Sequence, residues 1–110
     1  MRVASWDESA WKFSSEKLSK VPLFASPRFF LDLYCLEPGQ SQKPHAHEGS
    51  DKVYLVVEGR GRFRVADAER TLRAGEAVLA GSGEVHGIEN DSGARLVVLT
   101  WMAPPPPKHA

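Results

Sequence analysis

The chain has 110 residues, of which 42% are apolar, so its length suits one domain with a buried core and is too short for two. Fourteen basic residues balance fourteen acidic ones, and this disfavours nucleic acid or an anionic membrane as a partner. The single Cys35 lies in an apolar sequence, and the chain has neither a signal-like N-terminus nor an apolar run of spanning length. We therefore expect a cytoplasmic protein whose thiol is a small buried hydrophobe.

Residues 1–28 carry several aromatic side chains but show no sustained alternation of apolar and polar positions. Ser14 or Ser15 can cap a short helical turn through Leu18, and two prolines further on stop any longer helix. We expect an N-terminal arm that buries its aromatic side chains on its own domain or on a second subunit.

From Phe29 onward the sequence is typical of short strands, rich in branched and aromatic residues and separated by glycine-containing turns. The predicted strands are a stretch from Phe29 to the turn at Pro38-Gly39, the histidine-containing stretch after Gly39, Lys52–Glu58, Arg62–Ala66, Arg70–Arg73, Glu76–Ala80, His86–Glu89 and Arg95–Met102. This spacing predicts an all-β sandwich or barrel over residues 29–102. Residues 103–110, with four consecutive prolines, are predicted to be an extended tail in which His109 is solvated rather than turned back toward a cavity.

Two histidines, His45 and His47, are separated by one residue and precede the apolar run Val53–Val57. In an extended strand alternate side chains leave by the same face, so both imidazoles would point into one space. A third histidine, His86, lies between two further apolar runs, and a folded-back sheet can deliver it to the same point. Three imidazoles would fill three positions of a metal shell and leave others open, with iron, zinc, nickel, manganese and copper all compatible.

The sequence around these histidines resembles the two signature motifs of the cupins. The first motif, G-x5-H-x-H-x(3,4)-E-x6-G, is matched from Gly39 to Gly59, and the second, G-x5-P-x-G-x2-H-x3-N, from Gly75 to Asn90. The spacing agrees throughout, but two identities differ. Gly81 stands where the family usually has proline, and Lys52 stands where it usually has the glutamate ligand.

The resemblance implies an all-β, cupin-type double-stranded β-helix, or jelly-roll, barrel preceded by the N-terminal arm. It implies a divalent transition metal held by His45, His47 and His86, and a small-molecule ligand. Many proteins that resemble this one are dimers, which favours a homodimer.

The fourth metal position is left open because Lys52 replaces the usual glutamate. Adjacent strand residues face opposite ways, so Lys52 and Tyr54 would share the cavity face and Asp51 would point outward unless a bulge exchanged them. One arrangement is a three-histidine site with open positions, and a second is a shell completed by Asp51 or Glu48. In a third, the metal is weak or absent and the cavity binds an anion through Lys52 and the histidines. We favour the first two.

Two side chains beside the predicted metal are candidate catalytic residues. Tyr54 could hydrogen-bond a ligand or donate a proton, and Lys52 would place a charge beside the metal. Alternatively, Tyr54 only lines the core of the barrel, and Lys52 is a solvated strand residue; neither would then have a catalytic role. Gln42 lies an odd number of residues before His45, so it is given little weight as a cavity residue.

The function most consistent with these features is a metal-dependent enzyme, such as a dioxygenase, isomerase or related enzyme, acting on a small molecule. The alternative is a non-catalytic cupin that binds a sugar or organic acid with a structural metal or none, and a weaker one is a purely structural dimer. The sequence has no P-loop and no G-x-S-x-G motif, which disfavours phosphate-loop and serine-hydrolase chemistry.

Overall fold

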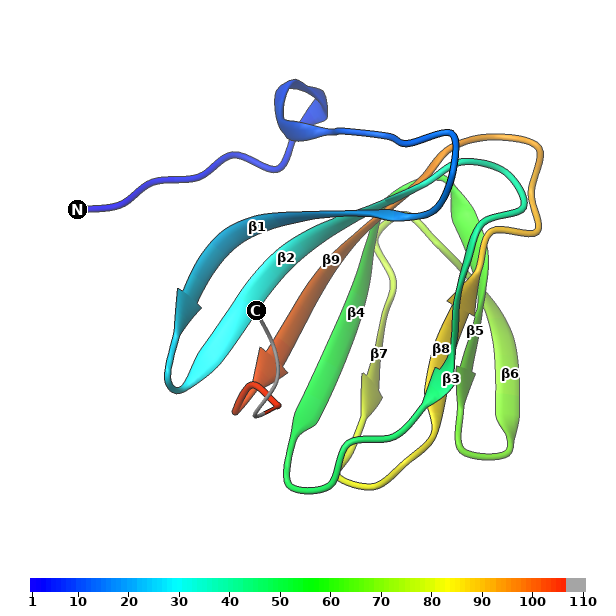
Figure 1. Ribbon diagram of the computed structural model, residues 1–110. Helices are drawn as coiled ribbons and strands as arrows, with labels where there is room; N and C mark the ends of the chain where they lie inside the picture. The colour runs from blue at the N-terminus through cyan, green and yellow to red at the C-terminus, as the bar shows by residue number, and fades with distance from the viewer. Residues whose placement is uncertain (107–110) are drawn as a thin grey trace.

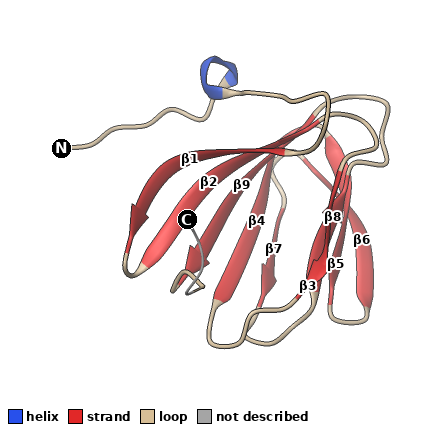
Figure 2. Ribbon diagram, viewed as in Figure 1, coloured by secondary structure: helices blue, strands red, loops and turns tan. Residues whose placement is uncertain are grey.

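The computed structural model describes residues 1–106, so His109 and the end of the proline-rich tail lie outside the described residues. The described part of the chain is almost entirely β-strand, with one short 3-10 helix near the N-terminus (Figures 1 and 2). Its elements are η1 (Glu8–Ala10), β1 (Ser19–Ser26), β2 (Phe29–Leu36), β3 (Ser41–His45), β4 (Asp51–Glu58), β5 (Arg60–Val65), β6 (Ala68–Arg73), β7 (Ala77–Ala80), β8 (His86–Glu89) and β9 (Leu96–Ala103). The predicted all-β fold is confirmed. No helix of residues 1–106 is long and apolar enough to cross a membrane.

The strands form two antiparallel sheets that face each other (Figure 1). The larger sheet has the order β1-β2-β9-β4-β7, and the smaller one has the order β3-β8-β5-β6. Side chains from both inner faces pack into one core, made of Tyr34, Leu36, Tyr54, Val56, Phe63, Leu72, Ile88, Leu96 and Val98. The two layers and their shared core are the jelly-roll barrel that the sequence predicts.

The first strand was not predicted from the sequence. β1 pairs with β2 along its whole length, with a register shift between Pro22 and Phe24. Proline lacks the N–H that a central strand needs, so it is tolerated in β1 because this strand lies at the edge of the sheet. The helical turn expected between Ser14 and Leu18 is not formed, and η1 lies earlier, where the Asp7 side chain accepts a hydrogen bond from the Ser9 amide.

The segment before β1 packs on the outer face of the larger sheet. Trp11 and Phe13 contact a buried cluster that contains Leu33, Cys35 and Val97. Cys35 is fully buried, and burial raises the pKa of its thiol, as expected of a packing residue rather than a nucleophile.

The histidines and Lys52 lie at one end of the barrel. His45 is the last residue of β3, Lys52 is the second of β4 and His86 is the first of β8. These strand ends all lie at the lower end of the barrel as it is drawn in Figure 1. Strand pairing thus brings segments far apart in the sequence to a single site.

Candidate metal centre and its cavity

The three predicted histidines converge. The potential ligand atoms of His45, His47 and His86 all lie within 4.8 Å of one another. His45 and His86 are direct partners in the β3–β8 ladder, and their ring centroids are 4.4 Å apart. The centroid of His47 lies 4.7 Å from that of His45 and 5.6 Å from that of His86.

His47 reaches this group differently from the prediction. It lies beyond the end of β3, so strand alternation does not orient it. A backbone hydrogen bond holds this loop, since the amide of Gly83 donates to the carbonyl of His47 at 3.0 Å. This hydrogen bond connects the loop after β3 to the turn before β8. The third histidine, His86, is the first residue of β8.

Backbone carbonyls fix the orientation of two of the rings. Nδ1 of His45 lies 2.8 Å from the carbonyl oxygen of Lys43, and Nδ1 of His86 lies 3.0 Å from that of Glu84. A carbonyl oxygen only accepts, so in each ring Nδ1 carries the hydrogen and Nε2 carries the lone pair. Metal-binding histidines usually donate their other ring N–H to a carbonyl or carboxylate in this way.

His86 supplies the test of whether the residues fit a metal. Its Nε2 is buried and has no hydrogen-bond partner among the described residues. A buried acceptor without a partner costs free energy, whereas a metal ion would satisfy it. The donor set of three imidazoles, one of them with an unsatisfied buried nitrogen, therefore fits a divalent transition metal.

The histidines are held in the neutral form that metals bind. Burial is the largest cause in each case, and it lowers the pKa of His45, His47 and His86, the last to about 4. The positive charge of Lys52 is a smaller cause that acts in the same direction on all three pKa values. Protons therefore compete less with a metal for these nitrogens than they would at ordinary histidines.

Lys52 lies inside the barrel, at the position where the family motif has glutamate. Its side chain is 2% exposed, and its Nζ lies 5.1 Å from the ring centroid of Tyr54. The pKa of Lys52 is lowered to about 7, chiefly by burial and then by the charge of Lys20, while the charge of Asp32 opposes the shift. An amino group that exchanges its proton near neutral pH therefore faces the histidines in place of a carboxylate.

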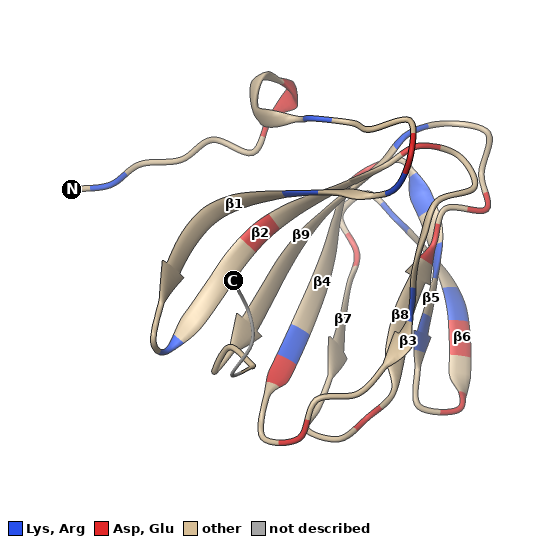
Figure 3. Cartoon of the chain, viewed as in Figure 1, with Lys and Arg blue, Asp and Glu red and all other residues tan. Residues whose placement is uncertain are grey.

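The two carboxylates considered as a fourth ligand are not brought to the histidines. Asp51 and Glu48 are exposed, and neither belongs to the cluster of potential ligand atoms among residues 1–106. Figure 3 shows the acidic and basic positions side by side at the start of β4. Because Lys52 points inward, its neighbour Asp51 points to the other face of the strand.

Tyr54 lies next to the histidines and is fully buried. Its ring centroid is 6.0 Å from that of His86, and its hydroxyl donates to Oε1 of Gln42 at 2.7 Å. Burial raises the pKa of the Tyr54 hydroxyl, so the group stays protonated. Gln42 faces inward because a register shift between it and His45 reverses the parity on which the sequence argument relied.

A cavity of about 410 Å³ opens beside the histidines. Its wall consists of Lys20, Phe30, Tyr34, Gln42, His45, His47, Lys52, Met102 and Pro106. Sequence reasoning did not single out Lys20, Tyr34 or the nearby buried Asp32, because they come from β1 and β2 and lie before the first motif. The alternation Phe30, Asp32, Tyr34 in a predicted strand was the available signal that these three share one face.

A family model described as cupin domain matches residues 32–102, which is more than half of the chain. The chain therefore belongs to the cupin family, as the motif spacing predicts. The match includes both motifs and all three histidines.

Two curated relatives are identical to the chain at about a third of the aligned positions. The oxalate-binding protein of Thermotoga maritima is 34% identical over 82 residues, which are 74% of this chain and 67% of that protein. The tetracenomycin polyketide synthase protein TcmJ of Streptomyces glaucescens is 34% identical over 79 residues, which are 72% of this chain and 53% of that protein.

Solved structures share the fold over nearly the whole chain. The crystal structure of TT1209 from Thermus thermophilus matches with a TM-score of 0.92 and 42% identity, covering 96% of this chain and 100% of that one. An RmlC-like cupin protein from Desulfovibrio desulfuricans matches with a TM-score of 0.82 and 24% identity, covering 96% and 98% of the two chains. The second likeness concerns the fold alone.

Proposed function

We propose that His45, His47 and His86 hold a divalent transition metal and that the protein acts on a small organic molecule bound beside it. The observation that carries the proposal is the buried Nε2 of His86, which has no partner within residues 1–106 and lies close to two other imidazoles. When bound, the metal would supply Lewis-acid polarisation of an oxygen on the ligand. A shell of three imidazoles without a carboxylate leaves positions for that oxygen.

The chain's own residues shape the rest of the site. The Tyr54 hydroxyl donates to the Gln42 side chain, and this hydrogen bond orients the amide at the cavity wall. The amino group of Lys52 lies 5.6 Å from the ring centroid of Tyr34 and 5.1 Å from that of Tyr54. In this proposal Gln42 and Lys52 contact the ligand, and Tyr54 positions Gln42.

Oxalate is the first ligand to test, because a relative with 34% identity is named an oxalate-binding protein. A non-catalytic binding role and a catalytic role both use this site, and they differ in whether the ligand is recovered unchanged. Incubation of the metal-loaded protein with oxalate, followed by mass spectrometry of the small molecules, separates the two roles.

Metal content tests the proposal directly. We expect near-stoichiometric metal by elemental analysis in the parent expressed without an affinity tag, and its loss in His45→Ala and His86→Ala. Asp51→Ala is the matched control for a nearby side chain outside the histidine group, and its metal content should equal that of the parent. Absence of metal from the parent, even after reconstitution with each candidate ion, would refute the proposal.

The homodimer and the cytoplasmic location remain predictions. Apolar side chains exposed on the outer face of the larger sheet support a pairing of two copies, since Leu79 is 59% and Trp101 53% exposed.

A further inference from the structure

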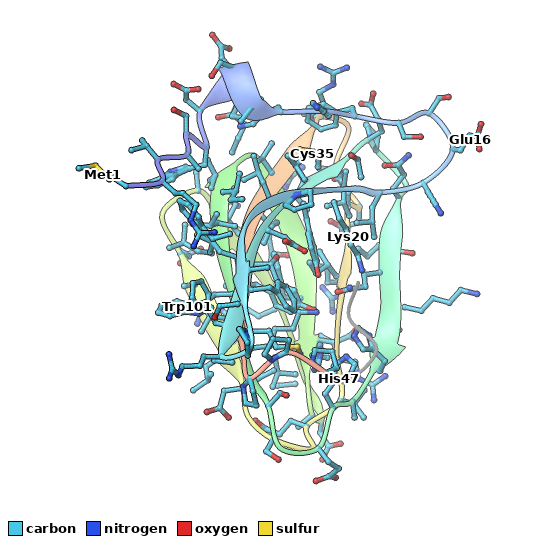
Figure 4. The ribbon with its side chains drawn as sticks, turned by 60° about the vertical axis from the view of Figure 1, so that its left-hand side comes forward. Met1, Glu16, Lys20, Cys35, His47 and Trp101 are labelled. Carbon is cyan, nitrogen blue, oxygen red and sulfur yellow. The ribbon has the colours of Figure 1, made fainter. Side chains whose placement is uncertain are left out.

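Two lysines from different strands face the same aromatic ring inside the cavity. Lys20 of β1 is the ladder partner of Tyr34, and its Nζ lies 5.2 Å from the centroid of the Tyr34 ring. The Nζ of Lys52, from β4, lies 5.6 Å from the same centroid. Figure 4, turned toward the β1 side of the molecule, labels Lys20 and His47. Lys52 is buried, whereas Lys20 is exposed at the cavity mouth.

The positive charges of this wall act on each other and on the histidines. Lys20 lowers the pKa of Lys52, and both lysines lower the pKa values of His45 and His47. Asp32 is the carboxylate that opposes the effect on Lys52. Like charges in a partly buried wall repel each other more strongly than in water, so a bound anion beside these amino groups would add to the effect of Asp32 and favour the protonated form of Lys52.

The remaining wall is apolar. Phe30, Met102 and Pro106 line the same cavity, and their side chains would contact carbon atoms rather than a hydrated inorganic ion. The cavity of about 410 Å³ has room for a small organic molecule that also reaches the histidines.

We propose that Lys20, Lys52 and the ring of Tyr34 form an anion subsite beside the histidine group, and that the ligand is a small organic acid whose carboxylate occupies it. The inference rests on the proposed function only in that another oxygen of the same acid would bind at the metal. The carboxylate subsite itself does not need the metal. Lysine in place of glutamate at position 52 reverses the charge of this wall and sets its preference for an acid over a neutral molecule.

Malonate is a suitable probe, and malonamide is its neutral counterpart of similar size. Calorimetric titrations use the full chain, both zinc-loaded and stripped of metal by a chelator. We expect the metal-stripped parent to bind malonate but not malonamide. Lys20→Met and Lys52→Met should each weaken malonate binding by an order of magnitude or more, because each removes one charge from the subsite. Lys17→Met removes a charge from an exposed bend outside the cavity wall and should leave the affinity unchanged.

The inference is overturned if the metal-stripped parent does not bind malonate, or if both lysine variants bind it as the parent does. Tighter binding of inorganic phosphate than of malonate would overturn the organic-acid assignment. Failure of the proposed metal site has a different signature, since the parent would then fail to bind zinc while malonate binding stayed dependent on both lysines. Circular dichroism checks that each variant folds. If Lys52→Met does not fold, Lys20→Met alone tests the inference, because Lys20 is exposed and its replacement should not disturb the core.

Discussion

Lys52 is a buried base whose protonation is coupled to folding. Its pKa of about 7 in the folded protein lies below the ordinary value of 10.5, chiefly because of burial. Between these two values the unfolded chain binds a proton that the folded chain does not. Stability therefore rises as the pH is raised through this window.

This coupling predicts a pH-dependent difference between the parent and Lys52→Met, which removes the titrating group and keeps the length of the side chain. Between about pH 7 and about pH 9, the free energy of unfolding of the parent should rise relative to that of the variant by roughly 2 kcal/mol. Urea denaturation of both metal-stripped proteins across this range measures it. A constant difference would show that Lys52 has an ordinary pKa.

A second prediction concerns the charge that Lys52 places beside the metal ligands. Lys52→Glu restores a carboxylate at the position where the family motif has its fourth ligand, so zinc affinity should increase by an order of magnitude or more. Lys52→Gln removes the positive charge without adding a carboxylate, and it should give a smaller increase. Competition with a chromophoric chelator measures both affinities, and an affinity at or below that of the parent in Lys52→Glu would contradict the prediction.

At the residue scale, motif spacing predicted which histidines meet and that Lys52 points inward. It did not predict Lys20 and Asp32, because their relation to the site depends on the pairing of β1 with β2 and of β2 with β9. Gln42 was given little weight for a related reason, since a register shift reverses the face on which it lies.

At the element scale, the site depends on how closely β3 lies against β8. β3 is an edge strand with β8 as its neighbour, and this pairing places His45 opposite His86. Gly87 lies beside His86, and a Cβ atom added there would be 2.9 Å from the carbonyl oxygen of Gln42 and 3.1 Å from Cα of Pro44. Both contacts are with backbone atoms, so β3 itself would have to move.

Gly87→Ala should therefore impair both the fold and the metal site. We expect a loss of about 1–3 kcal/mol in the free energy of unfolding, as for other overpacked sites, together with weaker zinc binding as His45 shifts away from His86. Gly93→Ala is the matched control, because a Cβ atom there would meet nothing within 4 Å. Urea denaturation and zinc titration of the two variants measure the effects. Equal behaviour of both variants would mean that β3 tolerates the displacement.

The boundaries of β2 and of β4 to β9 were predictable to within about two residues, because glycine turns separate runs of branched and aromatic residues. β1 was missed because Pro22 and the irregular pairing after it interrupt the pattern of an ordinary strand. His47 was assigned to a strand because alternation explained its spacing from His45, whereas the loop after β3 places it.

At the scale of the whole molecule, the larger sheet presents an apolar outer face. Direct ladder partners form a row across four strands, Leu31, Trp101, Val53 and Leu79. The next row consists of Leu33, Leu99, Leu55 and Ala77, of which Leu33 is covered by the segment before β1. Figure 3 shows no charged position on β7 or β9. Contiguous apolar patches of this kind mark interaction sites, and an apolar row suits pairing with a second copy of itself.

A charge at this face should therefore separate two copies of the chain. We expect the parent to be a dimer by size exclusion with light scattering and Leu79→Glu to be a monomer, because a carboxylate would be buried without a partner in the paired state. Leu79 is 59% exposed within one chain, so the variant should keep its fold and metal content. Ala68→Glu, which adds the same charge to an exposed position on β6 of the other sheet, should stay dimeric. A monomeric parent, or a dimeric Leu79→Glu, would assign this face another role.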